Sequence, residues 1–213
     1  TTAVLGPPKA IPGLSAVSAV ATYGDDYSVD PAHACAIHGA NGALSCWGEG
    51  DHGELGIGPV NAPVPTPTPV AIPNGEAIVS VAVGREFTCA VSAPGSVYCW
   101  GSNGSGQLGV DPAFSSVMIP TLVPGISTAL GVTARESHAC AWLADKTAVC
   151  WGANGEGELG DGTIEDRYAP TVVTGLGNVI EMSAGQTHTC ARHTDGKISC
   201  WGSSYSGQVG TGA

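Results

Sequence analysis

The chain has 213 residues, of which 32 are glycine and 15 are proline, and only 12% are charged. Eighteen acidic and seven basic residues give a formal charge of −11 without any Lys/Arg run, which argues against nucleic acid and anionic membranes as partners. The longest nearly uncharged apolar stretch near the start, Leu14 to Tyr23, is shorter than the roughly 20 residues of a membrane helix, so we expect no membrane insertion. Position 1 is Thr, and we expect a chain that is processed or cut from a longer one.

Four segments repeat one pattern along the chain. Each contains C-W-G-x4-G-[EQ]-[LV]-G, and their tryptophans lie 53, 51 and 50 residues apart, a period typical of propeller blades. The segments begin at His33, Phe87, His138 and His188, and the tryptophans are Trp47, Trp100, Trp151 and Trp201. The sequence therefore predicts one all-β domain over 1–213, a β-propeller of four blades with cores at about 14–58, 76–110, 126–162 and 177–210.

The first predicted element is a proline-containing outer strand at Pro7 to Ile11, which precedes the first repeat. The chain stops just after the fourth glycine loop, so the last blade lacks its own outer strand. Joining the two ends restores a normal repeat, and we expect the segment to latch the last blade, in cis or in trans. Three arrangements remain open: a closed ring of four blades, part of a longer propeller, and a protomer that completes its neighbour.

An insertion interrupts the first repeat. Ten residues lie between Gly24 and Cys35, where repeats two and four have only four. Because such a loop should project from one rim, its residues are binding candidates, although a tolerated surface insertion is the simpler interpretation. The candidates are Asp25, Asp26, Tyr27 and Asp30. Trp142, outside the repeated Trp-Gly series, is a second candidate, and packing between blades is the alternative for it.

Repeat two shows the expected strands of one antiparallel, four-stranded blade. They are Pro69 to Ile72, Ile78 to Val83, Phe87 to Val91 and Ser96 to Gly101. The stretch Ile78 to Val83 is apolar on both faces, as an innermost strand between neighbouring sheets should be. Proline is expected in the outer strand, because an edge strand need not donate every hydrogen bond.

All eight cysteines fall into pairs 10 or 11 residues apart, at matching places in consecutive predicted strands. A hairpin brings such residues within the roughly 5.5 Å that a disulfide needs, so we expect one cross-strand bridge in each blade. The pairs are Cys35 with Cys46, Cys89 with Cys99, Cys140 with Cys150, and Cys190 with Cys200. Zinc is the competing interpretation, since a histidine such as His33 stands two residues before a cysteine, but no C-x-x-C spacing occurs. We expect that histidine to pack beside the tryptophan of its own blade, and no metal at these positions.

Paired cysteines in this number favour an oxidising compartment: secretion, the cell surface or the periplasm. Acidic residues also gather in the glycine loops of repeats one and three. They are Glu49, Asp51, Glu54, Glu156, Glu158, Asp161, Glu165 and Asp166. We interpret them as solvated loops, with Ca²⁺ as the alternative, and expect no other cofactor.

The recurring H-x-C-A, G-x-x-x-C-W-G and G-[EQ]-L-G elements resemble the repeats of the regulator of chromosome condensation family over nearly the whole chain. The resemblance implies four-stranded blades around a central channel, usually seven in that family. It also implies a range of roles, from GTPase exchange on chromatin to secreted bacterial proteins and a β-lactamase inhibitor. We expect a non-enzymatic scaffold that presents rim loops to a protein or glycan. The alternatives are a fibre or lattice subunit assembled by strand exchange and an enzyme with a site over the channel.

Overall fold

The computed structural model describes residues 7–24, 32–111 and 113–212, which form four antiparallel sheets and one short 3-10 helix, Pro73–Gly75. Blade 1 contains β1 (Ala19–Tyr23), β2 (His33–His38), β3 (Ala43–Gly48) and β4 (Val64–Pro69). Blade 2 contains β5 (Ile78–Gly84), β6 (Phe87–Ser92), β7 (Val97–Ser102) and β8 (Ser116–Leu122). Blade 3 contains β9 (Ala129–Arg135), β10 (His138–Leu143), β11 (Ala148–Gly152) and β12 (Arg167–Val172). Blade 4 contains β13 (Val179–Ala184), β14 (His188–His193) and β15 (Ile198–Gly202).

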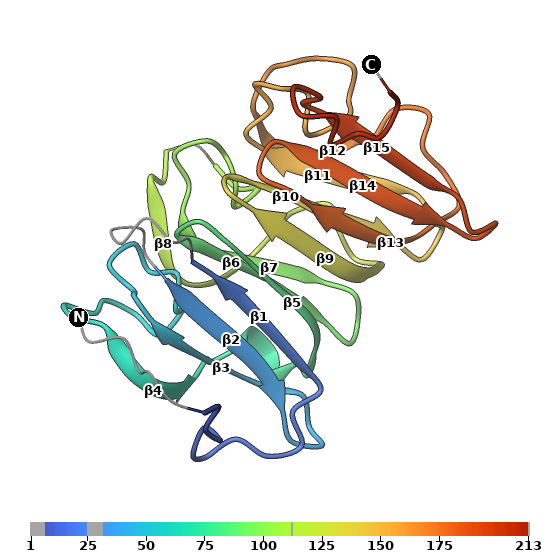
Figure 1. The fold of residues 1–213 in the computed structure, drawn as a ribbon. Helices are drawn as coiled ribbons and strands as arrows, with labels where there is room; N and C mark the ends of the chain where they lie inside the picture. Colours follow the sequence, from blue (N-terminus) through green and yellow to red (C-terminus); the bar gives the residue numbers. More distant parts are fainter. Residues whose placement is uncertain (1–6, 25–31, 112, 213) are drawn as a thin grey trace.

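The sheets follow one another in chain order as an arc, with blade 1 and blade 4 at its two ends (Figure 1). In each sheet the strands pair in sequence order, and the innermost strands β1, β5, β9 and β13 contact one another in succession. The expected all-β propeller architecture is therefore confirmed. Blades 1 to 3 have four strands, whereas blade 4 has three within the described residues.

The outer strand of blade 1 differs from the expected one. It covers Val64–Pro69, so only the first residue of the expected strand at Pro69 to Ile72 belongs to it. Its prolines occupy alternate positions, 65, 67 and 69, and alternate residues of a strand direct their N–H groups to the same side. The missing donors therefore all lie on one side, which an edge strand can leave unpaired.

Of the two expected forms of the latch, in cis or in trans, the one in cis does not form. Pro7 to Ile11 has no strand structure and is exposed, and β15 pairs only with β14 in the described part of the chain. The segment leads into β1, at the end of the arc away from β15 (Figure 1). The open arc places these two elements at opposite ends, so of the three arrangements left open by the sequence, the closed ring of four is not the one in this structure.

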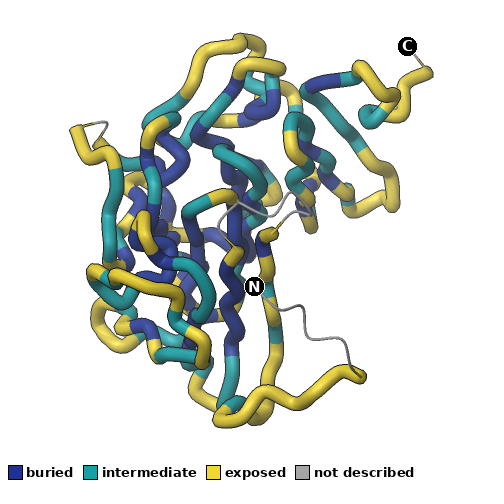
Figure 2. The backbone as a smooth tube through the Cα atoms, turned by 60° about the vertical axis from the view of Figure 1, so that its left-hand side comes forward, coloured by how far each residue is buried: buried dark blue, intermediate teal, exposed yellow. Residues whose placement is uncertain are grey.

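The hydrophobic core consists of three layers, each between two consecutive blades. Figure 2 shows the buried residues gathered in the interior, with exposed residues at the periphery, which includes the outer strands and many loop tips. At the centre of each layer lies the leucine of the G-[EQ]-L-G motif of the preceding blade. These leucines, Leu55, Leu108 and Leu159, are at most 1% exposed. Burial of a leucine contributes about 1.5 to 3 kcal/mol, so the loop motif stabilises the junction between blades.

The repeated tryptophan links each blade to the one before it. Its indole N–H donates to the backbone carbonyl of the Glu or Gln in the glycine loop of the preceding blade. The bonds are Trp100 Nε1 to Glu54 O (2.8 Å), Trp151 Nε1 to Gln107 O (2.9 Å) and Trp201 Nε1 to Glu158 O (2.7 Å). The Glu or Gln side chain in turn accepts the backbone N–H two residues earlier, as Glu54 does from His52 at 2.9 Å. The C-W-G and G-[EQ]-L-G motifs are thus two halves of one inter-blade contact.

Each blade contains the expected cross-strand disulfide. The bridged residues are directly opposite one another, with Cα atoms 4.1 to 4.2 Å apart. The bonds join Cys35 to Cys46, Cys89 to Cys99, Cys140 to Cys150, and Cys190 to Cys200. Because all eight sulfurs are bonded, they are not available as zinc ligands.

The histidine that precedes the first cysteine contacts the next blade, so the expectation that it packs beside its own tryptophan is wrong. His33 Nε2 lies 2.9 Å from Thr88 Oγ1, and His138 Nε2 lies 3.0 Å from Thr189 Oγ1. The register pairs Trp47 with Ala34, and adjacent residues of a strand point to opposite faces. His33 and Trp47 therefore lie on opposite faces of blade 1. At the middle junction, Phe87 and Ala139 take the places of the His and Thr.

Because these histidines are buried, we expect the protein to lose stability in acid. Burial lowers the pKa of His33 and of His138 to about 4, below the 6.5 of an unfolded chain. Between these two pKa values the unfolded state binds more protons than the folded state. Each histidine should therefore lower the free energy of unfolding by about 3 kcal/mol as the pH falls from 7 to 4. Burial raises the pKa of Glu54 and Glu158, which has the opposite sign: their contribution to stability is present at low pH and falls as pH rises.

A double variant isolates the histidine contribution. Replacing His33 by Phe and Thr88 by Ala copies the Phe87 and Ala139 pair into the first junction. Urea unfolding at several pH values should then show a decline toward pH 4 that is smaller by about 3 kcal/mol. The same exchange at His138 and Thr189 serves as an independent repeat. An unchanged pH dependence in both double variants would contradict the assignment.

Candidate binding face

The loops at one end of the blades form an acidic surface, here called the loop face. Its described segments are the turns after the inner strands (85–86, 136–137 and 185–187) and the loops that follow the third strands (49–63, 103–111 with 113–115, 153–166 and 203–212). Eleven of the 15 acidic residues in the described ranges lie there. They are Glu49, Asp51, Glu54, Glu86, Asp111, Glu136, Glu156, Glu158, Asp161, Glu165 and Asp166. Such a surface attracts cationic partners.

Two of these acids are structural, which corrects the interpretation of all of them as solvated. Glu54 is fully buried and Glu158 is 5% exposed. Each accepts a backbone N–H within its own loop, and burial raises the pKa of both carboxyl groups. Asp161 is engaged as well: burial opposes its ionisation, but hydrogen bonds from Thr163 and Arg167 lower its pKa to about 2. The remaining acids carry the charge of the face.

A polar cluster connects blades 1 and 3 across the inner edge of blade 2. The Tyr23 hydroxyl donates to Glu136 Oε1 at 2.7 Å, and the Arg135 guanidinium lies 5.1 Å from the centre of the Tyr23 ring. The Arg85 backbone N–H donates to the Glu136 carbonyl at 2.9 Å. Burial and the Glu136 carboxylate raise the pKa of Tyr23, which keeps its hydroxyl protonated. This cluster fixes the inner turns of three blades relative to one another.

The inserted residues of the first repeat follow Gly24 in the sequence. Asp25, Asp26, Tyr27 and Asp30 lie outside the described residues, so their role stays a prediction. The other candidate, Trp142, packs between blades 3 and 4, where its indole covers Gly131 so closely that a Cβ there would lie 2.0 Å from it. Glycine at 131 therefore makes room for the tryptophan. This packing accounts for Trp142 without a ligand.

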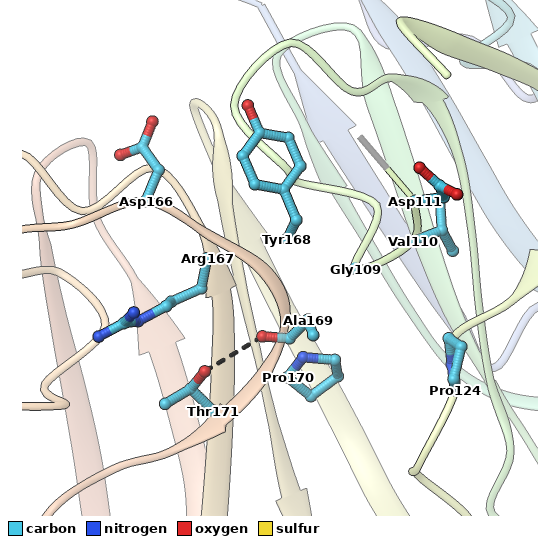
Figure 3. Close-up of a pocket in the computed structure, with 10 residues that line it drawn as sticks. All are labelled: Gly109, Val110, Asp111, Pro124, Asp166, Arg167, Tyr168, Ala169, Pro170 and Thr171. Atoms are coloured by element: carbon cyan, nitrogen blue, oxygen red, sulfur yellow. Dashed lines mark hydrogen bonds between the residues drawn. The ribbon is translucent and has the colours of Figure 1, made fainter. Parts of the chain in front are cut away.

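A groove of about 540 Å³ runs between blades 2 and 3, from the loop face along β12. Figure 3 shows its lining, with Tyr168 standing between Asp166 and Asp111 and with Arg167 directed away from Asp111. The Tyr168 hydroxyl donates to the Gly104 carbonyl of blade 2 at 3.1 Å, which fixes the ring. An aromatic ring flanked by two carboxylates is suited to a Lys or Arg side chain.

Three exposed apolar side chains on the loop face were missed by sequence reasoning. Phe114 is 57%, Ile164 is 68% and Tyr205 is 88% exposed. A large apolar residue inside a polar loop was the available signal, and it was hidden because these loops do not align in length between repeats. Exposed aromatic residues are frequent anchors of protein interfaces.

No group of three or more His, Cys, Asp or Glu side chains suited to a metal ion occurs among residues 7–24, 32–111 and 113–212. The calcium alternative therefore stays a prediction. In the same ranges, no helix has the length and apolar character needed to cross a membrane.

Comparison with known proteins gives one consistent family. The model of the regulator of chromosome condensation (RCC1) repeat matches residues 41–91, 94–142 and 150–192, and a second model of this repeat matches 78–107 and 179–208. The human probable E3 ubiquitin-protein ligase HERC6 is 35% identical over 121 residues, which are 55% of this chain and 12% of that protein.

Two solved structures share the fold at 23% identity. Human WBSCR16 matches with a TM-score of 0.79 over 92% of this chain and 50% of its own. Prp20p from Saccharomyces cerevisiae, described with its binding to Gsp1p and histones, matches with a TM-score of 0.71 over 82% of this chain and 43% of its own. The chain thus spans half or less of each of these proteins.

Proposed function

Because this chain belongs to the family of regulator of chromosome condensation repeats, we propose that it is a non-enzymatic scaffold whose loop face binds a basic partner protein. The observation that carries the proposal is the groove in which Tyr168 stands between Asp111 and Asp166. A cation held by a ring face and two carboxylates gains cation–π and charge-assisted interactions together. Relatives with protein partners, such as Prp20p with Gsp1p and histones, support a role in protein binding.

The distribution of charge supports the same partner. The exposed acids of the loop face include Glu156, Glu165 and Asp166. The opposite ends of the described blades have no acidic cluster of comparable size. Exposed apolar anchors such as Tyr205 accompany them. A basic protein surface would therefore be steered to this face and then held by contacts near the groove.

The disulfides support an exported protein. One bridge in each of four blades is typical of proteins that mature in an oxidising compartment. We place the protein outside the cytosol, where the partner would be a secreted or surface protein. Recovery of the oxidised chain, with no free thiols, from the exported fraction of its native cells tests this placement.

The binding test uses a fluorescent peptide of alternating arginine and glycine, with a glutamate and glycine peptide for comparison. We expect the arginine peptide alone to bind, with an affinity that falls as salt rises. Tyr168→Ala should weaken binding about three- to tenfold. The separate variant Asp111→Asn should weaken binding more than Tyr168→Ala does, and its side-chain oxygen can still accept the Ala113 N–H. Asp195→Asn removes an exposed carboxylate from the opposite end of blade 4 and should change nothing. Equal binding by all variants, or binding of the acidic peptide, contradicts the proposal.

A further inference from the structure

In blades 1 to 3 an outer strand pairs with the edge of the third strand, whereas the third strand of blade 4, β15, has no such strand in the described part of the chain. In blades 1 to 3, a β-branched residue after the outer strand donates its backbone N–H to the start of the third strand. These bonds are Val70 N to Leu44 O (2.9 Å), Val123 N to Val97 O (2.8 Å) and Val173 N to Ala148 O (3.0 Å). The matching acceptor in blade 4 is the carbonyl of Ile198, whose side chain is 67% exposed. No outer strand pairs with β15 in the described part of the chain.

The segment Pro7 to Ile11 has the sequence of such an outer strand. In each blade that has one, a proline stands three residues before the valine that donates: Pro67 and Val70, Pro120 and Val123, Pro170 and Val173. Pro8 and Ile11 repeat this spacing. The three valines are at most 7% exposed, whereas Ile11 is 45% exposed. Ile11 therefore has the sequence position of the buried valines but is exposed in the single chain.

The length of chain after this segment says where its own blade must sit. From the donor residue to the next inner strand there are eight residues in 70–77, six in 123–128 and six in 173–178. Residues 11–18, between the segment and β1, also number eight. This is a normal blade-to-blade connection, so pairing with β15 would make the attached blade 1 the neighbour of blade 4. In one chain, blades 1 and 4 lie at opposite ends of the arc (Figure 1), so residues 7–11 can pair with β15 only when they come from another copy.

The free face of blade 4 has the features of an inter-blade surface. The other six cysteines are fully buried, but Cys190 and Cys200 are only half-buried. They lie beside a groove of about 210 Å³ that is lined by Glu181, Met182, Ser183, Cys190, Ala191, Arg192 and Ile198. The carbonyl of Gln208 corresponds to those of Glu54, Gln107 and Glu158, and Trp47 of blade 1 has no such acceptor among the described residues.

We propose that two copies of this chain exchange Pro7 to Ile11, so that each supplies the fourth strand of the other's blade 4. Ile11 N donates to Ile198 O, Ile11 fills the place of the buried valines, and Trp47 of one copy donates to Gln208 O of its partner. The exchange is reciprocal, since each copy has one such strand and one such edge. Arg192 and Glu181, paired at 2.8 Å, form the polar part of the interface.

The test measures the mass of the full chain by light scattering over a range of concentrations. We expect about 42 kDa, twice the 21.1 kDa of one chain. Ile11→Asp should weaken the dimer by about a hundredfold, because a carboxylate would enter the core of blade 4. Since Ile11 is exposed within one chain, the variant should keep its fold, as circular dichroism can verify. Val17→Asp, at a 48% exposed residue outside the exchanged segment, is the matched control and should remain dimeric.

A second arm tests the edge itself. A chain that lacks residues 1–12 should be monomeric and should bind a synthetic peptide of residues 6–14, and Ile198→Asp should abolish peptide binding. A monomer at every concentration, a dimer that persists in Ile11→Asp, or an open-ended series of larger assemblies overturns reciprocal exchange. None of these results depends on the proposed binding of a basic partner, because the exchanged strand lies away from the groove at Tyr168.

Discussion

Reduction of the four disulfides is expected to unfold the protein at room temperature. Each bridge closes a loop of 10 or 11 residues and contributes about 2 to 3 kcal/mol in the chain-entropy model. Four such contributions are comparable with the 5 to 15 kcal/mol by which a domain is stable. Urea unfolding followed by tryptophan fluorescence, with and without reductant, measures the effect. An unchanged midpoint after complete reduction would show that the bridges do not stabilise the fold.

The bridges should also be reduced in a definite order. Cys35–Cys46, Cys89–Cys99 and Cys140–Cys150 are fully buried against the following blade, whereas Cys190–Cys200 lies on the free face of blade 4. Thiol exchange requires access of a thiolate to the sulfur, so in the monomeric chain that lacks residues 1–12 the fourth bridge should react first. Partial reduction followed by alkylation and peptide mass analysis identifies the bond that opens. Replacing both Cys190 and Cys200 by Ala should cost less stability than replacing Cys89 and Cys99, because it leaves no buried cavity.

The repeat itself was readable from sequence because it depends on local spacing. The Cys pairs sit 10 or 11 residues apart, which a hairpin converts directly into opposite positions, and the Trp period gives the blade length. The outer strand of blade 1 was misplaced because its alternating prolines mask the strand signal. Proline is normally read as ending a strand, and only the position at an edge makes this run acceptable.

The contacts between blades were not readable in the same way. Glu54 sits in an acidic loop and was interpreted as solvated, but its burial depends on Trp100 of the next blade. Likewise Tyr23 meets Glu136 across 113 residues of sequence. Contacts at such separation follow from the stacking of sheets, which no local pattern specifies. The groove at Tyr168 arises at a blade junction for the same reason.

The second large effect is expected at the tryptophan that joins blades 2 and 3. Trp151→Ala should lower the free energy of unfolding by about 3 to 5 kcal/mol, because it opens a cavity in a fully buried layer. It also leaves the Gln107 carbonyl, which accepts the indole N–H at 2.9 Å, without its partner. Trp151→Phe restores most of the packing but not the donor, so it should cost about 1 to 3 kcal/mol.

The equivalent tryptophans of the two end blades, Trp201 and Trp47, are the controls for Trp151. Trp201 makes the same bond to Glu158 O but is only half-buried at blade 4, so Trp201→Ala should cost less than Trp151→Ala. Trp47, at blade 1, has no preceding carbonyl among the described residues, and Trp47→Phe should cost the monomer least. If two copies exchange strands as proposed, Trp47→Phe should instead weaken the dimer. Equal losses of stability at positions 47, 151 and 201 would mean that the tryptophan acts within its own blade, and the contact to the preceding loop would not be what holds neighbouring blades together.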